Sequence, residues 1–120
     1  MKFLIDLIED IREQINNDSF YEIKAGLLKE NPNDASELIY GGEAPLLSWK
    51  LIEEKKEIVF YVDNDSKMTI EMLLPPLLIL DIDKMMYGVK IEVNERYKDM
   101  EVVGFGKNEE QKRYILFIKI

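Results

Sequence analysis

The side chains of this chain that could do chemistry are carboxylates, lysines and tyrosines, because its 120 residues include no histidine and no cysteine. Histidine is the side chain whose ordinary pKa lies closest to neutral pH, so the most accessible general base is missing. Thiol nucleophiles are missing too, as are the nitrogen and sulfur ligands of zinc sites. We therefore expect a protein that is not an enzyme and that uses neither a metal ion nor a cofactor.

Two Asp-x-Asp pairs offer the oxygen ligands that calcium and magnesium prefer. The pair Asp63 and Asp65 begins like a calcium loop, but Lys67 occupies the third ligand position and the central glycine is missing. The pair Asp81 and Asp83 falls in a segment that we expect to be helical, where the two side chains would project about 200° apart. Both pairs are therefore expected to be solvated, the first in a turn and the second near a helix start.

Four carboxylates near the N-terminus are spaced so that a helix would place them in one stripe. Asp6, Glu9, Asp10 and Glu13 follow the i, i+3, i+4, i+7 pattern of a single helical face. Such a stripe can bind a basic protein, because complementary charge raises the association rate and disfavours wrong partners. The alternative is a solvated helix face with no binding role.

Tyr40 and Trp49 are the aromatic candidates for a binding surface. They flank a break formed by Gly41-Gly42 and Pro45. Tryptophan and tyrosine dominate the energetics of protein interfaces, so we predict that both contact a partner. The alternative is that both are simply buried in the core.

A third candidate surface is the segment from Met72 to Leu80, nine uncharged apolar residues that include Pro75 and Pro76. Its length is less than half of the roughly 20 residues that a membrane-spanning helix needs. We expect the segment to pack on the sheet. The alternative is an exposed apolar patch for self-association or partner binding.

The first 40 residues are expected to be mainly helical. Residues 3–15 carry apolar side chains at helical spacing, namely Phe3, Leu4, Leu7, Ile8, Ile11 and Ile15. Residues 19–30 fit a helix, because Ser19 and Glu22 form a capping-box pattern, and also a strand, because apolar residues alternate from 21 to 27. The capping pattern favours the helix. Residues 35–40 are expected to add one further helical turn before the glycine pair.

From residue 47 onward the apolar pattern changes to the period of two that strands show. We expect three strands before Pro75, one helix over residues 77–87, and three strands after it. The expected strands are 47–54, 58–62, 68–72, 89–93, 101–105 and 114–120. This order predicts a single α+β domain over residues 1–120. It has N-terminal helices and a mainly antiparallel sheet of five to six strands, with one further helix after the third strand.

The net charge of −8 lies entirely in the first half of the chain. Residues 1–66 carry 15 acidic and 7 basic side chains, whereas residues 67–120 carry 9 of each. This balance disfavours nucleic acid and anionic membranes, because both require clustered cations. It favours a basic protein partner, although the charge alone could also serve only to keep the domain soluble.

These observations favour a non-catalytic, cytoplasmic protein-binding module, most concretely an antitoxin- or immunity-type inhibitor of a basic partner. Its carboxylates would then lie where the partner expects phosphate groups. One alternative is a secretion chaperone or adaptor that forms a homodimer. The other is a small ligand-binding domain or enzyme that uses carboxylates, lysine or tyrosine in a pocket.

Overall fold

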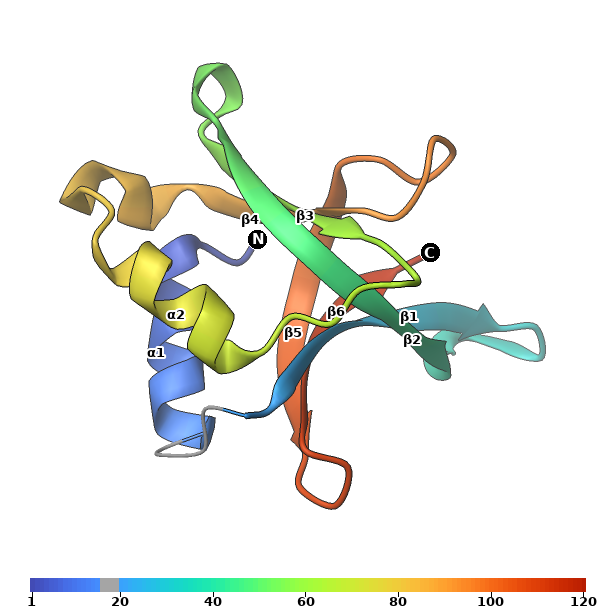
Figure 1. Ribbon diagram of the computed structural model, residues 1–120. Coiled ribbons are helices and arrows are strands. Elements are labelled where there is room, and N and C mark those ends of the chain that lie inside the picture. The colour runs from blue at the N-terminus through green and yellow to red at the C-terminus, as the bar shows by residue number, and fades with distance from the viewer. Residues whose placement is uncertain (16–19) are drawn as a thin grey trace.

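The computed structural model describes residues 1–15 and 20–120 of this chain. The described residues form two α-helices, two short 3-10 helices and six strands (Figure 1). In chain order they are α1 (Leu4–Ile15), β1 (Glu22–Asn31), β2 (Asp34–Ile52), η1 (Glu53–Lys55), β3 (Glu57–Val62), α2 (Ile70–Leu78), η2 (Ile82–Met86), β4 (Gly88–Glu92), β5 (Met100–Asn108) and β6 (Arg113–Lys119).

The six strands pair in sequence order and close into a barrel, because β6 pairs with β1. Four of the six pairings are antiparallel. The pairings of β3 with β4 and of β1 with β6 are parallel. A parallel pair needs a crossover connection, and α2 with η2 forms the connection between β3 and β4. Both helices lie together on one side of the sheet (Figure 1).

The core lies between the helices and the inner faces of the strands. Helix α1 contributes five buried side chains, and α2 contributes Ile70, Leu73 and Leu77. Among the strands, Ile23, Phe60 and others alternate inward with the period of two. Burial of these apolar side chains is the main stabilising contribution to the fold.

The α+β fold class is confirmed, as is a mostly antiparallel sheet of six strands, whereas the placement of the helices matches only roughly. Five expected elements are present, and each of their ends lies within three residues of its expected position. They are the helix at residues 3–15 and the strands at 58–62, 89–93, 101–105 and 114–120. These segments have strong apolar periodicity, which the tertiary structure reinforces.

Of the two interpretations of residues 19–30, the strand is correct and the favoured helix is wrong, and the helical turn expected over residues 35–40 is also wrong. Residues 22–31 form β1 and residues 34–52 form β2, which pair as a long hairpin. Strand β1 also pairs with β6 over its first seven residues, so its apolar side chains find partners on both sides. Residues 16–19, which include the expected capping serine, lie outside the described part of the chain.

The strand expected over 68–72 and the helix expected over 77–87 are also wrong. Helix α2 begins at Ile70, contains Pro75 and Pro76, and ends at Leu78. Residues 82–86 form only the short 3-10 helix η2, so Asp81 and Asp83 do not lie in an α-helix. A residue outside the helix holds the start of α2, because the Ile70 amide donates a hydrogen bond to the carbonyl of Tyr21, which directly precedes β1.

The hairpin of β1 and β2 extends beyond the barrel as an arm (Figure 1). Pairing of β1 with β6 ends at Leu28, whereas pairing with β2 continues to Asn31. Residues 34–41 are all exposed. The described residues contain no helix with the length and apolar character needed to cross a membrane.

Candidate functional site

The four carboxylates of the N-terminal stripe do lie together on α1. Asp6, Glu9, Asp10 and Glu13, hereafter the acidic α1 face, line one shallow hollow of about 210 Å³. Lys2 and Phe105 complete its lining. The helical spacing read from the sequence therefore predicted correctly which residues share this surface.

Two of these carboxylates accept hydrogen bonds from other parts of the fold. Asp6 accepts a hydrogen bond from the Phe3 amide at 2.8 Å, which satisfies a free donor at the start of α1. Asp10 accepts a hydrogen bond from the Tyr114 hydroxyl at 2.6 Å. Glu9 and Glu13 are exposed on the outer side of the helix. These two are therefore the carboxylates of the face that a partner could reach without loss of a structural contact.

Lysines border the acidic α1 face and reduce its negative potential. The Lys2 ammonium lies 5.7 Å from the centre of the Phe105 ring, inside the hollow. Lys107 donates a hydrogen bond to the Gln14 carbonyl at 2.8 Å, near the end of α1, and pairs with Glu109. The face is thus less strongly acidic than its sequence alone implies.

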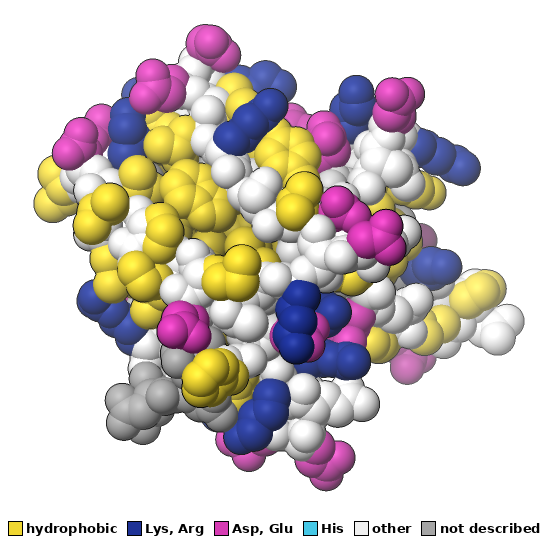
Figure 2. Space-filling view, viewed as in Figure 1, with side chains coloured by type: hydrophobic (Ala, Val, Ile, Leu, Met, Phe, Trp, Pro, Cys, Tyr) yellow, Lys and Arg dark blue, Asp and Glu magenta, His cyan; other side chains and the backbone are white. Residues whose placement is uncertain are grey.

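The segment around α2 forms an exposed apolar surface, which we call the apolar α2 face. Leu73 and Leu77 of this segment pack inward, as expected for a segment lying on the sheet. Figure 2 shows apolar side chains gathered over α2 and the turn that follows it. The exposed members are Met72, Pro75, Pro76, Leu78, Ile79, Ile82 and Met86.

Sequence reasoning found only part of the apolar α2 face. The uncharged run indicated residues 72–80. We expected this segment to pack on the sheet, with an exposed apolar patch as the alternative. The sequence also marks Met86 as suited to an adaptable surface or to the core, and the structure leaves it exposed. Ile82 was missed because residues 77–87 were expected to form one helix, whose buried stripe could have taken it inward, whereas the short η2 leaves it exposed.

Tyr40 lies at a different place, in a hollow of about 830 Å³ beside the turn between β5 and β6. Its ring packs edge-on against Phe117, with 6.1 Å between ring centres. Burial, together with the neighbouring Glu43 carboxylate, raises the pKa of Tyr40 to about 12. The phenol therefore stays protonated at neutral pH and can serve there as a hydrogen-bond donor.

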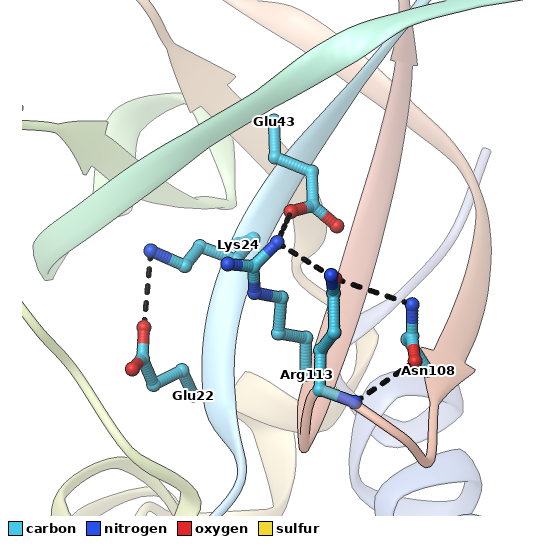
Figure 3. Close-up of polar contacts among 6 residues, drawn as sticks. Glu22, Lys24, Glu43, Asn108 and Arg113 are labelled. Atoms are coloured by element: carbon cyan, nitrogen blue, oxygen red, sulfur yellow. Dashed lines mark hydrogen bonds and ion pairs between the residues drawn. The ribbon is translucent and has the colours of Figure 1, made fainter.

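Arg113 lies at the centre of a group of polar contacts that lines the Tyr40 hollow (Figure 3). Its guanidinium pairs with Glu43 of β2 and hydrogen-bonds to Gln111 at 3.0 Å. Gln111 in turn exchanges hydrogen bonds with Asn108 across the β5–β6 turn. The Arg113–Glu43 and Lys107–Glu109 pairs thus match four of the five charged side chains that line the hollow.

Trp49 lies on β2, opposite Phe60 of β3, and packs partly buried against the core. Tyr40 and Trp49 do not line the hollow of the acidic α1 face. The six residues predicted to bind a partner therefore fall in three places: α1, the Tyr40 hollow and the β2–β3 pairing.

A small polar hollow that the sequence did not indicate lies over β2, β3 and the loop before β5. It measures about 210 Å³, and its lining includes Lys50, Glu57, Tyr61 and Asp99. Burial raises the pKa of Glu57, and a hydrogen bond with the Asp99 carboxyl raises it further. Carboxyls with raised pKa values occur at acid–base sites as well as in structural pairs. Glu57 and Asp99 lie 42 residues apart in the sequence, so no local motif could reveal that they form a pair.

Comparisons of this chain with family models, curated proteins and solved structures each found no match.

Proposed function

We propose that this chain is a non-catalytic protein-binding module that acts in the cytoplasm on a basic protein. Its most concrete form is an inhibitor of the antitoxin or immunity type, which covers a cationic surface of its target. The net charge of −8 supports a positively charged partner, because opposite charges accelerate and orient association.

The observation that carries the proposal is the apolar α2 face. Seven apolar side chains within fifteen residues are exposed together there. Continuous apolar patches on a folded domain are typical of sites where another protein binds, because contact removes them from water. The exposed Glu9 and Glu13 add a second surface that would attract a cationic partner over a longer range.

The test begins with the chain immobilised and exposed to a lysate of its source cells at low and at high salt. Each retained protein is then purified and its affinity for the chain is measured by calorimetry. We expect one basic protein to bind with 1:1 stoichiometry and to lose affinity as salt rises. Failure of every purified candidate to bind below about 10 μM would contradict the proposal.

A small ligand is the second candidate, and the hollow around Glu57 favours it. Lys50 and Tyr61 lie beside the carboxyl pair there, and Tyr61 raises the pKa of Lys50. A thermal-shift screen with divalent ions, nucleotides and small acids tests this candidate. A ligand at 100 times its Kd would add about 2.7 kcal/mol to the free energy of unfolding. The control is Glu57→Gln, which should abolish that shift.

A further inference from the structure

The apolar α2 face is held firmly from beneath. Leu73 and Leu77 on the inner side of α2 are completely buried in the core. The Ile70 amide donates a hydrogen bond to the Tyr21 carbonyl, and the Ile23 amide donates one to the Met68 carbonyl, so the start of α2 is tied to the start of β1. The exposed side chains of α2 therefore need no rearrangement of the core before they meet a partner.

Four large apolar side chains of this face are more than half exposed to solvent. Ile79 and Ile82 are 84% and 88% exposed, and Met72 and Met86 are 58% and 59% exposed. Isoleucine has a fixed shape, whereas methionine is flexible and adapts to irregular surfaces. Together they suit a partner that inserts apolar side chains of variable shape.

The charged side chains of α2 and of the turn that follows it are mainly acidic. Glu71, Asp81 and Asp83 are exposed along this segment, and Lys84 is the one cation among residues 70–86. The Lys84 ammonium is already engaged, because it lies 3.3 Å from Glu53 and 3.5 Å from Asp83. Three carboxylates and one lysine leave residues 70–86 with a net charge of −2, which a cationic partner would meet.

We propose that the apolar α2 face binds an amphipathic segment of a partner protein whose apolar side chains are flanked by lysine or arginine. The proposal rests on the proposed function and specifies the chemistry of the partner. Apolar side chains of the segment would cover Ile79, Ile82 and Met86. Its cations would lie against Glu71, Asp81 and Asp83, where opposite charge fixes the register.

Charge complementarity also distinguishes this occupant from two others. A second copy of the chain would bring an identical acidic segment against this one, and each copy carries a net charge of −8. A bilayer containing anionic lipid would repel the same carboxylates. Like charges at an interface raise the free energy of the complex, whereas a basic segment lowers it.

The test uses the full chain and two synthetic amphipathic peptides with the same leucine positions, one with lysine and one with glutamate at the polar positions. We expect the lysine peptide to bind and the glutamate peptide to bind at least about tenfold more weakly. Ile79→Ser with Ile82→Ser should weaken the lysine peptide by more than about tenfold. These side chains are so exposed that the variant should fold normally, as circular dichroism would check.

Two matched controls localise the binding. Leu38→Ser with Ile39→Ser removes two exposed apolar side chains from the β1–β2 arm and should leave the affinity for the lysine peptide unchanged. Glu9→Gln with Glu13→Gln removes two charges from α1 and should have less effect than Asp81→Asn with Asp83→Asn. Equal losses in both charge variants would show general attraction to an acidic protein and would overturn the proposal.

The other outcomes are equally decisive. No binding of the lysine peptide to the unmodified chain overturns the proposal. A dimer that dissociates in the Ile79/Ile82 variant would assign the face to a second copy. Binding to anionic vesicles that this variant abolishes would assign it to lipid. A purified partner that binds the Ile79/Ile82 variant normally would leave the proposed function intact and refute only this docking face.

Discussion

Tyr114 of β6 donates a hydrogen bond from its hydroxyl to the Oδ2 atom of Asp10 on α1, across 2.6 Å. The two residues lie 104 positions apart, so this bond joins the first helix to the last strand. The Tyr114 ring is completely buried and stacks on Phe105 of β5, with 6.2 Å between ring centres. Asp10 therefore has a structural role in joining α1 to the barrel.

Tyr114→Phe should lower the free energy of unfolding by about 1–2 kcal/mol. The ring and its packing remain, so the loss reports the hydrogen bond to a carboxylate. Urea denaturation followed by tryptophan fluorescence measures it. Tyr97→Phe, in the loop before β5, is the matched control and should change stability by less than about 0.5 kcal/mol. Equal stability of the Tyr114 variant and the unmodified chain would show that this bond contributes nothing.

Stability should fall at alkaline pH partly through Tyr114. Burial, followed by the bond to Asp10, raises the pKa of Tyr114 well above its usual range. The unfolded chain releases this proton near pH 10 while the folded chain keeps it. The contribution is thus complete below pH 10, and above it the free energy of unfolding falls by about 1.4 kcal/mol per pH unit.

Denaturation at pH 9, 10 and 11 tests that slope. Tyr114→Phe should be less sensitive than the unmodified chain between pH 10 and 11, because it lacks the titrating group. Tyr40→Phe is the comparison, since Tyr40 is about half exposed and its effect should be smaller. The same pH dependence in all three proteins would contradict the assignment.

Gly26→Ala should destabilise the fold by about 1–3 kcal/mol, because strand β1 passes close to β6 at this point. A Cβ atom at Gly26 would lie 2.6 Å from Ile115 Cγ2 and 2.7 Å from Phe117 Cδ1. Gly104→Ala on β5 is the control, since nothing lies within 4 Å of its Cβ position. Thermal unfolding of both variants gives the comparison. A loss in the Gly104 variant as large as that in the Gly26 variant would show that backbone freedom, and not crowding, is the cause.

Asp6→Ala should lower stability by about 1 kcal/mol through loss of its bond to the Phe3 amide and of a favourable charge at the start of α1. Glu9→Gln with Glu13→Gln should stay within about 0.5 kcal/mol of the unmodified chain. Denaturant titrations separate the two classes of carboxylate. A destabilised glutamine variant would mean that the acidic α1 face cannot be tested for binding without loss of structure.

The β1–β2 arm should exchange its backbone amides early. Residues 34–41 are exposed and have strand pairing only with β1, whereas Ile58 and Phe60 of β3 are completely buried. Local opening of the arm therefore exposes little apolar surface and needs less free energy than global unfolding. Hydrogen exchange read by mass spectrometry should show amides of 34–41 exchanging at least about tenfold faster than those of 58–60. Equal protection would indicate that the arm is held by contacts beyond its own hairpin.

Local pattern was enough to predict α1, the strands at residues 58–62 and 89–93, and the shared face of Asp6, Glu9, Asp10 and Glu13. In each case the relevant neighbours lie within a few residues, so the period of the apolar side chains identifies the element. Total charge and the lack of histidine and cysteine are likewise properties of the sequence alone.

Contacts between distant residues decided the rest. Residues 22–31 became a strand because β6, about 90 positions away, pairs with them and buries Ile23 and Ala25. At the start of helix α2 the Ile70 amide donates a hydrogen bond to the carbonyl of Tyr21, which lies 49 positions earlier in the chain. A capping pattern or a pair of prolines contributes about 1–3 kcal/mol, and long-range pairing and burial exceed that.

The candidate surfaces divide in the same way. The sequence determined which residues are apolar or acidic, and the helical spacing on α1 followed from it. Only the tertiary structure decided that Asp10 is held by Tyr114, that Lys84 is held by Glu53, and that Ile79 and Ile82 face solvent. Exposure and pairing depend on what folds against a residue, and in this barrel those neighbours come from distant parts of the chain.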